Sequence, residues 1–220
     1  MSDLKSRLVE AVQRANAQHR TTPAQAQAFG GGFSLDDTAT HPAPTAKKAA
    51  VLVACVPNPE PSVVLTVRAQ GVPQHAGQVA LPGGRHHQGE AFPDETALRE
   101  AHEEVGLDPS DAESLGVLLP VVTLTGYAVT PVVAWVDRPV QLAPQEREVS
   151  QIFYWPLVDV LNPERYSTHR LSVPTPGRVM RYRIWRLQGG QWPIWGATAE
   201  ILAQLAHGWR GRTSSSVAWR

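Results

Sequence analysis

Acidic side chains gather in one short stretch of the chain, residues 83–107. Glu100, Glu103 and Glu104 lie within one turn of a predicted helix, and Glu90 precedes that helix. Like charges three and four residues apart on a helix repel each other by roughly 0.2–0.5 kcal/mol per pair. A divalent cation among the carboxylates reverses this cost, because hard cations take oxygen ligands. Magnesium bound in this way keeps coordination positions for water and substrate phosphates, so the stretch indicates diphosphate or phosphate-ester chemistry.

The segment that carries these acids has the sequence features of a helix. Pro93 and Asp94 suit a helix start, because proline is tolerated in the first turn and an acid there complements the helix dipole. Gly106 suits a left-handed C-cap position. Apolar residues recur at helical spacing on one side, namely Leu98, Ala101 and Val105. We therefore expect a helix from about residue 94 to residue 105 that packs on a sheet through this side and presents its glutamates on another.

The residues around the glutamates help to distinguish a metal site from a solvent-exposed, charged helix face. A solvated, charged helix face is the simpler interpretation of the glutamates alone. The Gly83–Gly84 pair, however, can bring backbone groups close to an ion, and Glu90 adds an acid just before the helix. Arg99 can reach Glu95 or Glu103, four residues away, and hold a carboxylate in a fixed orientation. Together these features favour the metal site.

The remaining sequence predicts a mixed sheet covered by helices, because strand patterns come in hairpins and runs rather than in a strict strand–helix–strand repeat. Strands are expected at residues 49–56, 62–69, 78–82, 113–120, 129–136, 149–154 and 178–187. Helices are expected at residues 3–18 and 198–207, with a helical turn at 156–161. Residues 19–46 are rich in Ala, Gln, Thr, Pro and Gly and are expected to form a loop or arm.

Composition argues against several classes of protein. The formal net charge is zero, so no global field draws the chain to nucleic acid or anionic lipid, and neither partner is expected. The single cysteine, Cys55, rules out an internal disulfide; it lies in an apolar run, where a buried residue is expected rather than a nucleophile. No apolar segment approaches the roughly 20 residues that span a bilayer, and the N-terminus is polar. We therefore expect a cytoplasmic protein.

Residues 84–107 resemble the Nudix box, the motif of the Nudix hydrolase superfamily. That motif is usually written as Gly, five residues, Glu, seven residues, then Arg-Glu-apolar-any-Glu-Glu-any-Gly-apolar. Here Gly84 is followed after five residues by Glu90, and after eight more by Arg99-Glu100-Ala101-His102-Glu103-Glu104-Val105-Gly106-Leu107. The departures are one inserted residue before Arg99 and the small Ala101 at the apolar position. Every acidic position is filled.

Residues 65–84 resemble the signature that precedes the box in the coenzyme A pyrophosphatase branch of this family. The shared elements are Leu65-Thr66-any-Arg68-Ala69, then Gly77, then Pro82-Gly83-Gly84. That branch also carries the extra residue within the box. Two positions depart from the signature, with Pro73 in place of Arg and Leu81 in place of Phe. Residues 125–133, 148–157 and 194–202 are similar to the branch as well, whereas the N-terminal arm lies outside the resemblance.

The resemblance implies a fold and an activity. The fold is α/β (α+β), a Nudix-type α/β/α sandwich with a mixed β-sheet. The activity is metal-dependent hydrolysis of a diphosphate linkage, with Mg²⁺ or Mn²⁺ as cofactor. Coenzyme A or an acyl-coenzyme A would give adenosine 3′,5′-bisphosphate and 4′-phosphopantetheine. Residues 1–46 are expected to form an N-terminal helix and flexible arm, residues 47–210 the hydrolase domain and residues 211–220 a tail. A homodimer is left open.

The resemblance also implies which residues form the site. The metal ion is expected on Glu100, Glu104, Glu103 and the backbone carbonyl of Gly83, with Glu90 acting through water or through another ligand. Glu100 or Glu103 is expected to act as general base, with Arg99 orienting one of them. The alternative bases are Glu146 and Glu148 in a downstream loop. Substrate contacts are expected from Arg68, His75, Gly84 and Arg85.

Other interpretations remain open. The same chemistry could act on ADP-ribose, NADH or a nucleoside triphosphate, and Pro73 and Leu81 leave room for these substrates. The alternative of another class is a non-catalytic Nudix-like domain that senses a nucleotide, although such domains tend to lose the box carboxylates.

His86 and His87 are adjacent and lack a nearby cysteine, so a zinc site is not expected. Core positions are expected for Trp192, Trp195 and Trp209, rather than stacking on a base.

Overall fold

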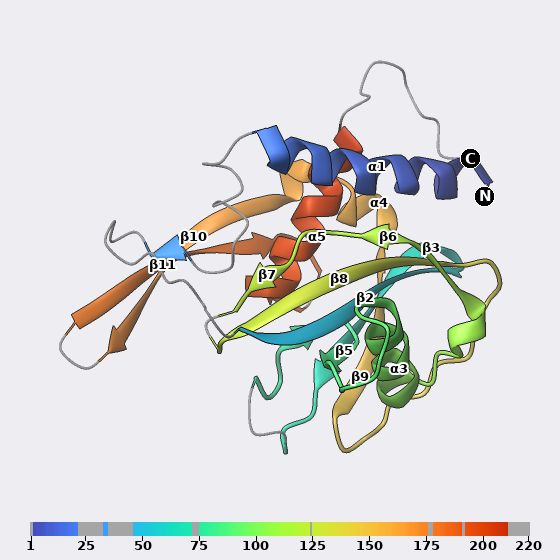
Figure 1. The fold of residues 1–220 in the computed structure, drawn as a ribbon, viewed down its shortest axis with the longest axis horizontal. Helices are drawn as coiled ribbons and strands as arrows, with labels where there is room; N and C mark the ends of the chain where they lie inside the picture. The colour runs from blue at the N-terminus through green and yellow to red at the C-terminus, as the bar shows by residue number, and fades with distance from the viewer. Residues whose placement is uncertain are drawn as a thin grey trace.

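The computed structural model describes residues 2–21, 33–34, 46–71, 75–123, 125–175, 178–190 and 192–210. In these residues a mixed sheet lies between helix α3 on one side and helices α1 and α5 on the other (Figure 1). Helix α1 spans Ser2–Thr21, α3 spans Asp94–Val105 and α5 spans Gly196–Trp209. The expected α/β/α sandwich is therefore confirmed.

The main sheet is built on three long strands, β2 (Lys47–Asn58), β3 (Glu60–Arg68) and β8 (Tyr127–Val136). Strand β2 pairs with β8 in parallel and with β3 antiparallel, so the sheet is mixed. The row runs β4-β3-β2-β8-β6, and β5, β7 and β9 pair with β2, β8 and β3 respectively. The short strands are β4 (Val79–Ala80), β5 (Gly83–Arg85), β6 (Ala112–Val117), β7 (Val121–Val122) and β9 (Val149–Pro156).

Strand β2 supplies both faces of the core, which explains its nearly continuous apolar sequence. Ala50 and Leu52 pack on the α3 side, whereas Val53 and Cys55 pack on the side of α1 and α5. This alternation follows from the two-residue period of a strand. Burial raises the pKa of the Cys55 thiol to about 12, which suits a core residue and not a nucleophile.

Helix α1 belongs to the same core as α5. Its buried residues are Leu8, Ala11, Val12 and Ala15. The two helices approach closely at Gly208, because any side chain there would meet the backbone of Ala11. Arg14 reinforces the contact by donating from Nε to the Gly208 carbonyl oxygen over 2.8 Å. Within the described residues, no helix is both long and apolar enough to cross a bilayer.

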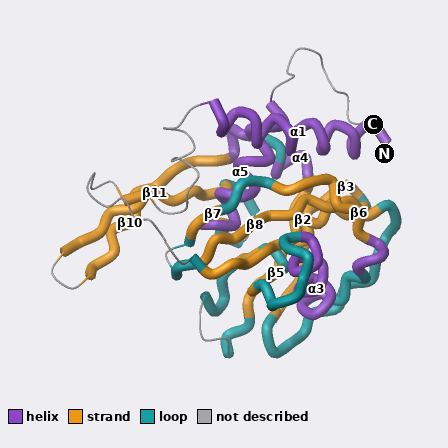
Figure 2. Tube along the Cα trace, viewed as in Figure 1, coloured by secondary structure: helices purple, strands orange, loops and turns teal. Residues whose placement is uncertain are grey.

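A second, smaller sheet extends from the main body (Figure 2). Its strands are β1 (Phe33–Ser34), β10 (Tyr166–Thr175), β11 (Arg178–Leu187) and β12 (Ile194–Trp195). Strands β10 and β11 form a long antiparallel hairpin. The connection from β9 into this hairpin contains helix α4 (Leu157–Val160) and a 3-10 turn (Pro163–Arg165), and another 3-10 turn (Pro109–Asp111) precedes β6.

Several sequence expectations were incomplete. Helix α1 runs to Thr21 rather than to residue 18, and β1 lies within the segment expected to be a loop or arm. Strand β10 was not expected at all, and the Gly83–Arg85 segment, expected to be loop, forms β5. The rest of the arm, residues 22–32 and 35–45, lies outside the described residues, and so does the tail from residue 211.

Candidate active site

Gly83 and Gly84 bring strand β5 against the acidic side of helix α3. Gly83 has a φ angle of 158°, and a Cβ atom there would lie 2.5 Å from the Ala50 carbonyl oxygen, so only glycine fits. A Cβ atom on Gly84 would lie within 2.5 Å of both carboxylate oxygens of Glu100. The glycine pair is thus required for the close approach of this strand to the helix.

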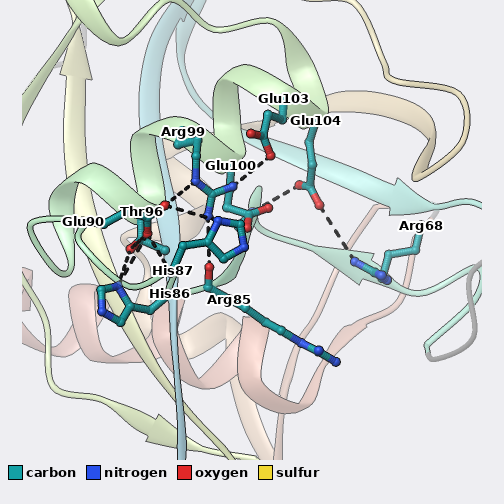
Figure 3. Close-up of polar contacts among 11 residues, drawn as sticks. Arg68, Arg85, His86, His87, Glu90, Thr96, Arg99, Glu100, Glu103 and Glu104 are labelled. Atoms are coloured by element: carbon teal, nitrogen blue, oxygen red, sulfur yellow. Dashed lines mark hydrogen bonds and ion pairs between the residues drawn. The ribbon is translucent and has the colours of Figure 1, made fainter.

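The guanidinium group of Arg99 lies among the carboxylates (Figure 3). Its Nε donates to Glu90 Oε1 over 2.6 Å, and its Nη1 donates to Glu103 Oε2 over 2.8 Å. Its Nη2 donates to Glu100 Oε1 over 2.9 Å and to the backbone carbonyl of Arg85 over 3.0 Å. One side chain therefore fixes three glutamates and ties helix α3 to strand β5.

Glu90 is held by more than Arg99. The Thr96 hydroxyl donates to Glu90 Oε2 over 2.5 Å, and the backbone N–H of His87 donates to the same oxygen over 3.0 Å. These bonds, that from Thr96 first, lower the pKa of Glu90 to about 2, so this carboxylate stays ionised. Of the two expected partners of Arg99, Glu103 is the one contacted. Glu95 instead accepts a bond from the backbone N–H of Ala91 over 2.6 Å.

Glu104 does not lie on a solvated helix face. It is only 4% exposed, and its Oε2 accepts a hydrogen bond from the backbone N–H of Gly83 over 3.1 Å. Arg68 Nη1 lies 4.0 Å from its other oxygen (Figure 3). Burial raises the pKa of Glu104 to about 7, despite the opposing effects of Gly83 and Arg68. Burial also raises the pKa of Glu100. Glu104 lies one turn after Glu100, and both carboxylates face β5, but Glu104 is buried there rather than solvated.

The acidic cluster has the donor atoms and the charge for a divalent cation. It contains four carboxylates, Glu90, Glu100, Glu103 and Glu104, against the two nearby guanidinium groups of Arg99 and Arg68. Negative charge is therefore in excess, and burial disfavours the ionised forms of two of these groups. A hard cation would stabilise those ionised carboxylates, so the residues fit such a cation.

The carboxylates are not arranged as a finished metal site. Among the residues that the structure describes, no three acidic, histidine or cysteine side chains converge on one point. The carboxylates do not converge because each is hydrogen-bonded elsewhere. Arg99 donates to Glu100 and Glu103, and the Gly83 N–H donates to Glu104. A bound cation would exchange some of these bonds for its own.

A cavity of about 460 Å³ opens beside the acidic cluster. The four residues expected to contact substrate, Arg68, His75, Gly84 and Arg85, all line it. The Arg85 guanidinium lies over the Tyr127 ring, 5.4 Å from its centroid. Most of the other lining residues are apolar, so one cavity brings cationic groups together with an apolar surface.

Arg68, the last residue of β3, is held at the cavity by backbone bonds to the loop that follows it. The pairing of β3 with β9 shifts register between Val67 and Arg68. The backbone N–H of Arg68 then donates to the Gln78 carbonyl, and the N–H of Gly77 donates to the Arg68 carbonyl, both over 3.0 Å. These bonds give the Arg-Ala and Gly elements of the sequence signature a structural role. Pro73 lies outside the described residues, and Leu81 is buried in the core.

Other expected residues are placed as follows. Glu146 and Glu148 are both exposed residues of one loop, and Glu148 is close enough for its charge to raise the pKa of Glu100 and Glu104. His86 Nδ1 lies 3.2 Å from the Thr96 hydroxyl. Trp192 and Trp209 pack against the core as expected. Trp195 does not, because it is 38% exposed and lines the cavity.

Sequence reasoning missed Thr96. Its hydroxyl holds Glu90, and the residue lies three positions before Arg99, so both side chains share one side of helix α3. That spacing was the signal that could have revealed it.

Comparison with known proteins decides the family. The family model of the NUDIX domain matches residues 46–175. The chain belongs to the Nudix family. It is 42% identical over 160 residues to the uncharacterized Nudix hydrolase NudL of Escherichia coli strain K12, an alignment that covers 73% of this chain and 81% of that protein. NudL of Shigella boydii serotype 18 matches with the same values.

A solved structure is also similar. The Nudix hydrolase RenU of M. smegmatis aligns with a TM-score of 0.44 and 28% identity, covering 52% of this chain and 73% of that one. The family match and the curated relatives make this chain a Nudix hydrolase. Enzymes of this family use divalent metal ions and act on small nucleotide substrates.

Proposed function

We propose that this Nudix hydrolase cleaves the diphosphate of coenzyme A or an acyl-coenzyme A, releasing adenosine 3′,5′-bisphosphate and 4′-phosphopantetheine. The observation that carries the proposal is the meeting of two features. A carboxylate cluster with excess negative charge adjoins a cavity that is lined by Arg68 and Arg85. Water adds to one phosphorus, the bridging P–O bond breaks, and each product leaves with a terminal phosphate. We assign the activity to residues 47–210.

The cation-binding role falls to the buried acids. Glu100 and Glu104 are the ligands that the geometry favours, because Glu104 is buried, Glu100 is half-buried, and both face β5. Glu103 and the Gly83 carbonyl are the additional candidates, and Glu90 acts through Arg99 or through water. Mg²⁺ or Mn²⁺ bound there would neutralise the diphosphate and lower the pKa of an attacking water.

The chain's own cationic groups bind and orient the substrate. Arg68 and Arg85 line the cavity, where guanidinium groups can form paired hydrogen bonds with phosphate oxygens. Gly84 has no side chain, which lets the Glu100 carboxylate lie directly against the strand that lines the cavity. His75 lines the same cavity, and its Nδ1 lies 2.9 Å from Gln78 Oε1, a contact that orients the ring.

Glu103 is the best-placed general base. Its side chain is 56% exposed, so water reaches it, while the Arg99 Nη1 bond fixes its orientation. Glu100 is more deeply buried and better suited to a cation. A base must be within hydrogen-bond reach of the water that it deprotonates, and an exposed carboxylate beside the buried pair meets that requirement. Glu148 is the alternative, because its charge acts on Glu100 and Glu104.

A substrate panel tests the proposal. Wild-type protein is incubated with Mg²⁺ or Mn²⁺ and with coenzyme A, acetyl-coenzyme A, ADP-ribose, NADH or a nucleoside triphosphate in separate wells, and products are followed by mass. The proposal predicts 4′-phosphopantetheine, or its acyl form, as the fastest-formed product. Faster cleavage of ADP-ribose or NADH would retain the diphosphate chemistry and overturn the coenzyme A assignment. Binding without cleavage of any substrate would indicate a nucleotide sensor.

A further inference from the structure

A buried acid lies in the same cavity, far along the chain from the Nudix box. Glu200 is on helix α5, lines the cavity, and is only 4% exposed. Its Oε1 is buried and, among the described residues, has no hydrogen-bond partner. A buried polar atom without a partner costs free energy, about 1–3 kcal/mol in proteins. Such an atom on a cavity wall indicates a ligand that would satisfy it.

The position of Glu200 relative to the carboxylate cluster favours a role in substrate selection. The acidic side of α3 and helix α5 lie on opposite sides of the main sheet (Figure 1). The cavity connects them, because it is lined by Gly83, Gly84 and Arg85 as well as by Glu200. A substrate whose diphosphate lies at the glycine strand can therefore place its remaining part beside α5.

The start of α5 is fixed against the cavity. The Thr198 hydroxyl donates to the Val79 carbonyl over 3.2 Å, which ties the first turn of α5 to strand β4. Trp195, just before the helix, lines the cavity and is partly exposed. Glu200 is thus presented from a fixed helix rather than from a loop, as a residue that discriminates between ligands must be.

We propose that Glu200 selects substrates by forming a two-point hydrogen bond with a nitrogen group that carries an N–H donor beside an acceptor, on the part of the substrate beyond the diphosphate. This inference rests on the diphosphate hydrolysis proposed above. A protonated carboxyl offers one O–H donor and one carbonyl acceptor. Burial raises the pKa of Glu200 to about 8, which keeps the carboxyl mostly protonated at neutral pH. The amino edge of adenine presents the complementary pair, whereas a trans secondary amide holds its N–H and C=O on opposite sides.

Equilibrium binding to the full-length protein tests the inference without hydrolysis. Calorimetry in EDTA compares wild type, Glu200→Leu and Glu200→Gln. Three probes test which part of the substrate is bound: coenzyme A, its counterpart with an unsubstituted purine, which lacks the adenine amino group and any N–H donor on the base, and 3′-phospho-ADP, which lacks the pantetheine amides. We expect Glu200→Leu to weaken coenzyme A binding about tenfold, the size of one lost hydrogen-bonded contact. Glu200→Gln, which keeps one donor and one acceptor, should bind within about threefold of wild type.

The probes then name the source. If the adenine edge is bound, the effect of Glu200→Leu persists with 3′-phospho-ADP and disappears with the unsubstituted-purine counterpart. The reversed pattern would place a pantetheine amide at Glu200 and overturn the two-point contact. Equal binding of coenzyme A by Glu200→Leu and wild type would overturn the inference, and so would an equal loss with all three probes.

Gln204 supplies the matched control. It lies one turn further along α5 and is fully buried, and its side-chain oxygen has no partner among the residues that the structure describes, but it does not line the cavity. Gln204→Leu should leave all three affinities unchanged; a loss like that of Glu200→Leu would indicate a general packing effect. Hydrolysis of coenzyme A by wild type is measured separately. Its absence with intact Glu200-dependent binding would overturn the proposed reaction alone.

Discussion

Arg99 Nε lies 2.6 Å from Glu90 Oε1, which joins the middle of helix α3 to the loop that precedes it. The same guanidinium also holds Glu100, Glu103 and the Arg85 carbonyl. The extra residue between Glu90 and Arg99 therefore does not prevent these two residues from meeting. A cation-binding cluster of this kind depends on groups that hold the carboxylates as well as on the carboxylates themselves.

Replacing Arg99 should lower activity without abolishing the fold. We expect Arg99→Ala to reduce kcat by about 10- to 100-fold, because three glutamates lose their common partner. Arg99→Lys should not restore the rate, because an ammonium group cannot reproduce the four hydrogen bonds that the planar guanidinium group of Arg99 donates. Steady-state kinetics with saturating Mn²⁺ measure both. Arg138→Ala, which breaks only the exposed pair with Asp111, is the control and should leave kcat unchanged. Full activity of Arg99→Lys would contradict this account.

Gly84→Ala tests the contact between strand β5 and Glu100. The added Cβ would lie within 2.5 Å of both Glu100 oxygens, so the carboxylate must move. We expect weaker Mn²⁺ binding and lower activity, by about tenfold or more, with secondary structure retained. Gly71→Ala is the matched control, because a Cβ atom there would have nothing within 4 Å. Calorimetric titration with Mn²⁺ measures the effect, and equal affinities for the two variants would refute it.

The stability of the protein should carry a pH signature of Glu200. Burial raises its pKa to about 8 in the folded state, so its contribution to stability is fully present below its unfolded pKa, about 4.5, and falls as pH rises toward 8. The maximum slope for one group is about 1.4 kcal/mol per pH unit. Other charged or titratable groups also bear on the pH dependence of stability. Arg68, His75 and Arg85 line the same cavity as Glu200, and the pKa of Glu104 is raised as well.

The difference between wild type and Glu200→Gln isolates this one group. Urea unfolding from pH 5 to pH 8 should show the variant gaining stability relative to wild type as pH rises, because glutamine has no proton to lose. A constant difference across this range would show that the carboxyl is not held protonated in the folded protein.

Three glutamate variants compare the candidate bases. Glu103→Gln should lower kcat by about 10²- to 10⁴-fold, the usual contribution of a general base. Glu148→Gln should cost less than about tenfold, because its charge acts on Glu100 and Glu104 from outside the cluster. Glu146→Gln, an exposed residue in the same loop, should behave as wild type. Rates measured across pH would decide the matter, and a larger loss for Glu148→Gln than for Glu103→Gln would move the base to the loop.

The sequence predicted helix α3 well because its signals are local. Pro93 directly precedes the helix and Gly106 has a φ of 73° at its C-cap, as the residue types indicated. Burial of Glu104 was not predictable from spacing, because an acid that bonds a backbone N–H in a neighbouring strand has the same sequence pattern as a solvated one.

Features formed by distant segments were missed for the same reason. Strand β10 contains Pro, His and Arg and has no clear alternation, so only its pairing with β11 defines it. The cavity joins residues from β2 to α5, and Glu200 looks in sequence like any acid in a helix. Family resemblance supplied the site residues that geometry alone would not have singled out, such as Arg68.

Cleavage of coenzyme A by wild type and by Glu104→Gln, followed by mass in Mg²⁺ or Mn²⁺, tests the central claim most directly. Glu164→Gln, an exposed glutamate outside the site, serves as control. The account predicts 4′-phosphopantetheine from wild type and from the control, and a loss of about 100-fold or more in Glu104→Gln, whose buried carboxylate is proposed to hold the cation. Undiminished cleavage by Glu104→Gln would contradict the assignment of the site.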